Sequence, residues 1–88
     1  MADGLHRERR ALAIAVRELR VRRSLKQEEV CEASGLGRNY LTTLESGRTN
    51  PSFDAMVRVA RGLGVSFADL ARVYEERLEE TGASPAGP

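Results

Sequence analysis

The sequence is poor in the residues that build cross-links, metal centres and catalytic sites. Cys31 is its only cysteine and His6 its only histidine. One cysteine excludes a disulfide within the chain, and these two residues do not form a metal-ligating cluster. We therefore expect no metal and no cofactor. Because no Cys-His or Ser-His-Asp set can be assigned to a pocket, the sequence also does not indicate an enzyme.

Long apolar runs and strand patterns are missing too. No run of about 18 apolar residues would span a membrane, and no purely apolar stretch near the start resembles a secretory signal. No alternating pattern is long enough for a strand. The chain has 88 residues, of which 41% are hydrophobic and 31% charged. We expect one helical, cytoplasmic domain with no room for a second one.

The net charge is only +1, but the charges are unevenly distributed. Residues 1–23 carry seven Arg and three acids, whereas residues 62–88 carry two Arg and five acids. The amino-terminal part is therefore better suited to contact phosphates, with the carboxy-terminal part facing away. The same charges would equally fit solvated helix faces.

Apolar spacing and stop signals predict five helices. The first three are expected at about residues 7–23, 26–34 and 38–46, with Ser24 and Gln27 as the capping box of the second. Gly35 and Gly47 are suited to end the second and third helices. Ser52 is expected to cap a fourth helix that Gly64 ends, and Ser66 opens a fifth.

Each predicted helix has an apolar side that we expect to be buried. The expected core residues are Leu12, Ala15, Val16, Leu19, Leu25, Val30, Tyr40, Leu41, Leu44, Phe53, Met56, Ala60, Leu63, Leu70, Val73, Tyr74 and Leu78. Residues 1–80 would form one domain, and residues 81–88, rich in Gly, Ala, Ser and Pro, are expected to be a disordered tail.

The second and third helices are short and are joined by a tight turn, Gly35-Leu36-Gly37. This arrangement is typical of a helix-turn-helix, whose second helix enters the DNA major groove. Arg38, Asn39, Thr42 and Thr43 are then free to face outward. Arg can pair with guanine, Asn with adenine, and Thr with the thymine methyl group. We predict that these four residues read bases.

The stretch from residue 16 to residue 70 resembles the lambda-repressor-like, or Cro/repressor-type, helix-turn-helix family. The resembling segments are residues 16–20 (VRELR), 25–30 (LKQEEV), 35–41 (GLGRNYL), 44–48 (LESGR), 50–52 (NPS) and 60–65. The sequence of residues 38–41 (RNYL) is also similar to that of restriction-modification controller proteins. The resemblance implies a compact, all-α, five-helix domain whose partner is double-stranded DNA.

The same resemblance assigns roles to individual residues. Gln27, Arg48 and Asn50 would contact phosphates, with Gln27 also bracing a recognition side chain, while Arg20 and Glu45 would form an inward structural salt bridge. The sequence departs from the family at Lys26 and Gly37, where Ser or Thr usually caps a helix, and at Cys31, where a small Ala is usual.

Two aromatic side chains have alternative roles. Tyr40 fits a core or rim contact, but its hydroxyl also lies within possible reach of a phosphate. The apolar stripe of the fifth helix, which includes Val73, Tyr74 and Leu78, could pack on its own domain. Because Tyr74 and Leu78 lie beyond the usual boundary of the family and have no obvious internal partner, the three residues are predicted to pack against a second copy.

Together these patterns predict a cytoplasmic, nucleoid-associated transcriptional regulator, either repressor or activator. It would act as a homodimer on a pseudo-palindrome whose half-sites lie about 34–36 Å apart. The alternative is an antitoxin or adaptor whose main role is to bind a partner protein of unknown identity.

Overall fold

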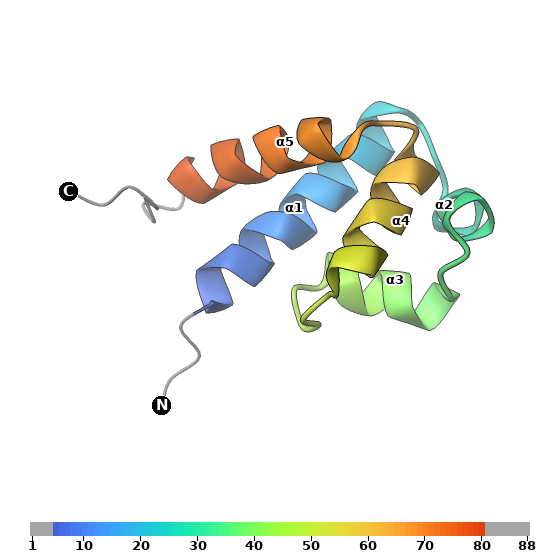
Figure 1. The fold of residues 1–88 in the computed structure, drawn as a ribbon, viewed down its shortest axis with the longest axis horizontal. Helices are drawn as coiled ribbons and strands as arrows, with labels where there is room; N and C mark the ends of the chain where they lie inside the picture. The colour runs from blue at the N-terminus through green and yellow to red at the C-terminus, as the bar shows by residue number, and fades with distance from the viewer. Residues whose placement is uncertain (1–4, 81–88) are drawn as a thin grey trace.

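A computed structural model describes residues 5–80 of the chain, and these residues form five α-helices and no strand (Figure 1). The helices are α1 (His6–Arg22), α2 (Gln27–Ser34), α3 (Arg38–Glu45), α4 (Phe53–Leu63) and α5 (Phe67–Glu80). The predicted all-α, five-helix fold is confirmed. The ends of the first three helices differ from the predicted ends by at most one residue. The predicted tail, residues 81–88, lies outside the described residues.

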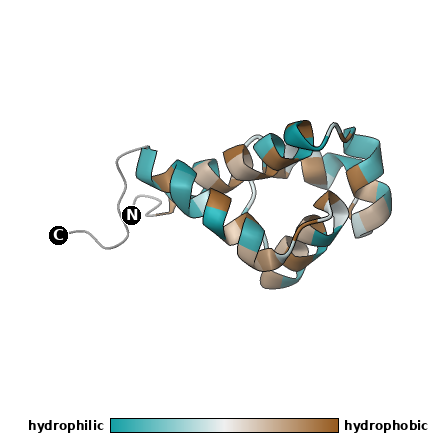
Figure 2. Cartoon of the chain, turned by 90° about the horizontal axis from the view of Figure 1, so that it is seen from above, coloured by the Kyte–Doolittle hydropathy of each residue, from teal (hydrophilic) through white to brown (hydrophobic). Residues whose placement is uncertain are grey.

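The helices pack in two main pairs around one core. Figure 1 shows α1 and α5 side by side. Helix α4 packs against α2, and α3 contacts α1 and α2. Side chains from all five helices form the core: Leu12, Ala15, Val16, Leu19, Val30, Leu41, Leu44, Val59, Ala60, Leu63, Leu70 and Val73. Figure 2 shows hydrophobic and hydrophilic residues interspersed along the helices, with the last turns of α5 largely hydrophilic. None of the described helices is long and apolar enough to cross a membrane.

Glycine lets α2 and α4 approach closely. A Cβ atom on Gly62 would lie 2.8 Å from the carbonyl oxygen of Val30 and 2.9 Å from the Cβ of Ser34. Glycine inside a helix costs up to about 1 kcal/mol relative to alanine, and the close contact explains why it stands here. Because α2 is held so near α4, the turn and helix that follow α2 have a fixed support.

The predicted capping box of α2 is wrong. Ser24 does not cap the helix but takes a left-handed turn conformation, with φ of +56°, after Arg23, the C-cap residue of α1. Lys26 is the N-cap residue, and its backbone N–H donates to the carboxylate of Glu29 over 2.7 Å. Because a lysine side chain has no acceptor, the cap depends on the glutamate alone. The helix therefore begins at Gln27, one residue later than predicted.

The predicted buried face of α4 is wrong at its first residue. Phe53 is 67% exposed, and its ring meets that of Phe67 edge-on with centroids 5.5 Å apart. Ala55 and Val59 are buried instead, together with the predicted Ala60 and Leu63. The small residues on this side of α4 allow it to pack closely against α2. The buried side of α4 therefore faces away from Phe53.

The structure also contradicts the view that the end of α5 lacks an internal partner. Leu78 is 2% exposed and Val73 is 6% exposed within a single chain. The reason is that α5 packs mainly along α1, where Ala11 and Ala15 are fully buried and allow a close approach. Val73 and Leu78 are therefore core residues, and of the predicted dimer contacts only Tyr74 remains partly exposed.

Candidate nucleic-acid interface

Helix α3 has one buried side and one polar, exposed side. Leu41 and Leu44 are buried, at 0% and 2% exposure. The four predicted base-reading residues are exposed together on the other side: Arg38, Asn39, Thr42 and Thr43. The structure therefore brings these four residues to one surface. An exposed polar helix face supported by a preceding helix is the geometry that fits a DNA major groove.

The hydroxyl of Thr43 is already engaged within α3. It donates to the backbone carbonyl of Asn39 over 2.8 Å. The oxygen can still accept a hydrogen bond, but its proton is in use. Thr43 is consequently suited to meet a thymine methyl group or a base donor such as a cytosine or adenine amino group.

An ion pair joins α1 to the end of α3. Arg20 Nε donates to Glu45 Oε2 over 2.7 Å, and Arg20 Nη2 donates to Glu45 Oε1 over 3.1 Å. The two side chains are 16% and 7% exposed. Arg20 Nη1 also donates to the carbonyl of Leu25 over 3.0 Å. The pairing that the family resemblance implies is thus present, and its hydrogen bonds raise the pKa of Arg20 against the opposing effect of burial.

Gln27 extends this ion pair to the start of α3. Its Nε2 donates to Glu45 Oε1 over 3.1 Å, and its Oε1 accepts a hydrogen bond from Arg38 Nε over 2.9 Å. A continuous set of hydrogen bonds therefore runs from α1 through both ends of α3. Gln27 braces Arg38, and one hydrogen of its amide group is left for the predicted phosphate contact.

Glu28 is a neighbour of Arg38 that sequence reasoning missed. Its Oε2 lies 3.5 Å from Arg38 Nη1, and the two side chains are 68% and 56% exposed. An acid beside Gln27 was visible in the sequence. Only the fold shows that the first turns of α2 and α3 lie close enough for this pairing.

The remaining predicted phosphate contacts lie at the edges of α3. Arg48 and Asn50 are exposed in the loop that follows it, and Tyr40 is half-buried on the helix. Gly37 begins the helix in an extended conformation and provides no side-chain cap. The first backbone N–H groups of α3 are therefore without a cap from Gly37, and such groups suit anions.

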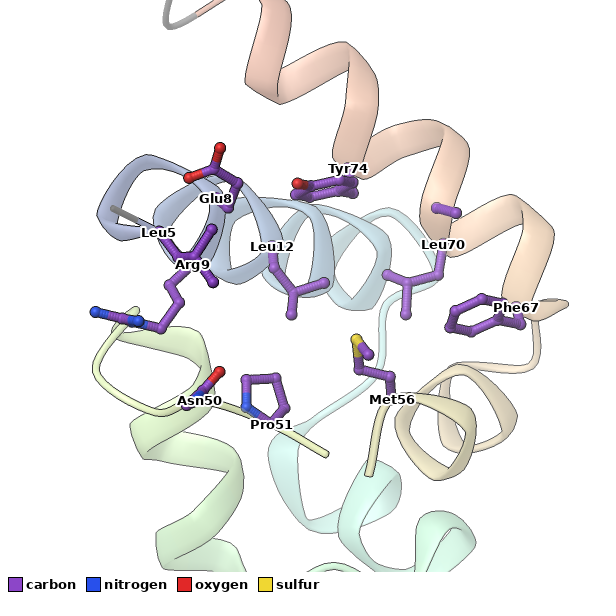
Figure 3. A pocket seen from close by; sticks show the side chains of 11 residues that line it. Leu5, Glu8, Arg9, Leu12, Asn50, Pro51, Met56, Phe67, Leu70 and Tyr74 are labelled. Carbon is purple, nitrogen blue, oxygen red and sulfur yellow. The ribbon is translucent and has the colours of Figure 1, made fainter. Parts of the chain in front are cut away.

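An apolar groove of about 390 Å³ lies between α1, α4, α5 and the loop after α3. Figure 3 shows Leu12, Leu70, Met56 and Phe67 around it, with Tyr74 and Glu8 on one side and Pro51 on the other. Burial raises the pKa of Tyr74, and the negative charges of Glu8 and Glu75 add to this shift. One carboxylate oxygen of Glu8 is buried without a hydrogen-bond partner.

Exposed apolar side chains gather around this groove. Leu5 and Phe67, which line it, are 53% and 40% exposed, and Phe53 beside Phe67 is 67% exposed. The groove and its aromatic edge are therefore the main feature that sequence reasoning missed. Within residues 5–80, no group of three or more histidine, cysteine or acidic side chains is arranged to hold a metal ion.

The fold and the exposed α3 define the class of protein. Residues 11–73 match the helix-turn-helix domain family, so the chain belongs to that family. A related sequence is the transcriptional repressor RstR of the cryptic phage CTXphi from Vibrio cholerae, 35% identical over 65 residues. The match covers 74% of this chain but only 59% of RstR.

Two solved structures extend the likeness. The clp gene regulator ClgR from Corynebacterium glutamicum is 32% identical, with a TM-score of 0.79 over 86% of this chain and 81% of that chain. The restriction-modification controller protein C.AhdI from Aeromonas hydrophila is 31% identical, with a TM-score of 0.67 over 70% of this chain and 94% of that chain. The predicted likeness to controller proteins is thereby confirmed.

Proposed function

We propose that this protein is a sequence-specific, DNA-binding transcriptional regulator that reads bases in the major groove through α3. The observation that carries the proposal is the presentation of Arg38, which Gln27 braces at the start of the exposed face of α3. Asn39, Thr42 and Thr43 lie on the same face. Related proteins named as a repressor and a gene regulator support this role. The protein acts on nucleoid DNA and is not an enzyme.

Phosphate contacts would set the position of α3 on the duplex. Arg48 and Asn50 flank its carboxy-terminal end, while Tyr40 and the free amide hydrogen of Gln27 lie toward its start. Contacts of this kind fix register and orientation but carry no sequence information. Two of the four groups would therefore meet phosphates near the start of α3 and two near its end.

The regulator would act as a homodimer through the apolar groove. Tyr74, Phe67 and Leu5 line this groove, and Phe53 adds a further exposed ring at its edge. A two-fold axis brings the same patch from both copies together, so these side chains would cover one another. Asn50 and Pro51 also line the groove, which places it directly beside the loop that follows α3. A dimer formed there keeps residues 5–80 as one domain with α5 at the interface.

The double variant Phe53→Ser/Phe67→Ser tests this interface. We expect it to sediment as a monomer while the wild-type chain sediments as a dimer. Val21→Ser is the matched control, because Val21 is 58% exposed but does not line the groove. A wild-type monomer, or a double variant that stays dimeric, would contradict the proposed interface.

Selection of bound duplexes from a randomised DNA pool tests the function itself. At about 150 mM salt, non-specific phosphate binding is weakened and base readout decides which duplexes survive. We expect an enriched inverted repeat with half-sites about one helical turn apart. A pool that remains random after several rounds would contradict sequence-specific binding.

A further inference from the structure

Arg38 is held so that part of its hydrogen-bonding capacity is used and part is free. A guanidinium carries five N–H donors in a fixed plane. The Nε donor is occupied by Gln27 over 2.9 Å. Bidentate recognition of guanine requires two parallel donors, and the terminal Nη1 and Nη2 groups provide such a pair. The brace therefore leaves an end-on contact with guanine open.

Glu28 acts on the same guanidinium without occupying a donor. Its carboxylate oxygen lies 3.5 Å from Nη1, which is too long for a strong hydrogen bond but close enough for charge attraction. The carboxylate therefore offsets part of the positive charge of Arg38. The orientation of the guanidinium, and with it the direction of the Nη1 and Nη2 hydrogens, is set by the hydrogen bond to Gln27.

We propose that Glu28 is a specificity-determining residue, because its carboxylate beside Arg38 weakens the attraction of this arginine to any phosphate while leaving its donors available for guanine. The proposal rests on the proposed function, since it assumes that α3 reads bases. A phosphate recognises mainly the charge of Arg38, whereas a guanine edge recognises two donors in a defined geometry. Offsetting the charge of Arg38 consequently weakens binding to DNA of random sequence more than binding to the specific site.

The test compares the full chain with three single variants and one double variant. Glu28→Gln removes the charge, Arg38→Gln removes the guanidinium, and Glu32→Gln is the matched control on an exposed acid of the same helix. Glu28→Gln/Arg38→Gln shows whether the effect of Glu28 passes through Arg38. The probes are a duplex selected from the random pool, its single-base variants, and a duplex of unrelated sequence, each titrated at several salt concentrations by fluorescence anisotropy.

For Glu28→Gln, we expect binding to the unrelated duplex to tighten by about two- to fivefold, the range of an exposed ion pair. Base discrimination at the position that Arg38 reads should fall by a similar factor. If Arg38 gains one phosphate contact, the slope of log affinity against log salt should steepen by about 0.9. Glu32→Gln should leave discrimination unchanged, and the effect of Glu28→Gln on discrimination should vanish in the double variant.

Two results would overturn the inference in distinguishable ways. If Arg38→Gln flattens the preference at one base pair but Glu28→Gln behaves like Glu32→Gln, the role of Glu28 is wrong and the proposed function stands. If Arg38→Gln alters no base preference, base reading by Arg38 fails and the role of Glu28 fails with it. Melting curves of all variants serve as the check that the exposed substitutions leave the fold intact.

Discussion

The two sides of the molecule are held together by different forces. The contact between α1 and α5 is mainly apolar, with Leu70, Val73 and Leu78 nearly fully buried; a single ion pair between Arg77 and Glu18 also joins the two helices. Helices α2 and α3 bury fewer apolar residues, and directed hydrogen bonds join them to each other and to Arg20 of α1, through Glu45, Gln27 and Arg38. Burial of apolar side chains stabilises the fold but does not fix how a side chain is oriented, because it is non-directional. Hydrogen bonds do fix orientation, because they require a defined geometry.

This difference matches the role proposed for each side. A base-reading side chain must be placed to within a fraction of an ångström, because bidentate pairing with a base has a defined geometry. A surface that meets a second copy of the chain needs apolar area and shape. Accordingly, hydrogen-bonded polar side chains lie beside α3 and exposed aromatic rings lie beside the groove.

The largest expected effects come from removing one contact on each side. Leu70→Ala creates a cavity at a residue that is 1% exposed and should lower the free energy of unfolding by about 2–5 kcal/mol. Glu45→Ala leaves Arg20 largely buried and unpaired and should cost about 2–4 kcal/mol, somewhat less than a fully buried pair because Arg20 keeps some exposure. Urea unfolding followed by circular dichroism measures both losses.

The two variants should differ in DNA binding even where their stabilities are alike. Glu45→Ala also removes the acceptor of Gln27 and so loosens Arg38, which should reduce base discrimination. Leu70→Ala should leave discrimination unchanged once the folded fraction is equal. Equal discrimination in the two variants would contradict the division of labour between the two sides.

A smaller effect is expected where α2 approaches α4. Gly62→Ala gains about 1 kcal/mol of helix propensity, but its new Cβ would meet the Val30 carbonyl at 2.8 Å. Because overpacking costs about 1–3 kcal/mol or more, we expect a net destabilisation of about 1–2 kcal/mol. The matched control is Ala33→Gly at an exposed position of α2, which should lose about 1 kcal/mol from helix propensity alone. A more stable Gly62→Ala would show that α2 and α4 can move apart freely.

The smallest effect is expected at the exposed start of α5. Hydrogen bonds from Arg72 and then Ser66 hold the pKa of Asp69 below its ordinary value of 3.8. Folding therefore favours the ionised form, so its stabilisation is complete above the ordinary value and is lost as the pH falls through the folded-state pKa. Asp69→Asn should slightly flatten the decline in Tm between about pH 5 and pH 2. Glu79→Gln, a change at another exposed acid of α5, serves as the control, and an equal flattening there would remove the role of Asp69.

Local features of the sequence predicted the helices and the exposed face of α3. The glycines at residues 35 and 64 end helices in left-handed conformations, as their lack of a side chain allows. Apolar spacing separated Leu41 and Leu44 from the polar residues of α3. These signals involve residues that are close together in the sequence, so they can be read without knowing how the helices pack.

Features that depend on contacts between helices were harder to predict. Leu78 is buried because α5 packs along α1. The apolar pattern of α5 does not indicate which helix it packs against. Phe53 was placed in the core for its hydrophobicity, whereas small Ala55 and Gly62 take the buried positions. The pairing of Glu28 with Arg38 likewise depends on how two separate helices meet.

If Arg38 reads a guanine in the major groove, a single substitution in the DNA should show it. Replacing that guanine with 7-deazaguanine removes the N7 acceptor from the major groove and leaves Watson–Crick pairing in place. We predict that the wild-type chain loses about 1–3 kcal/mol of binding free energy and that Arg38→Ala loses almost nothing further. An equal loss in both proteins, or no loss in the wild type, would contradict the claim.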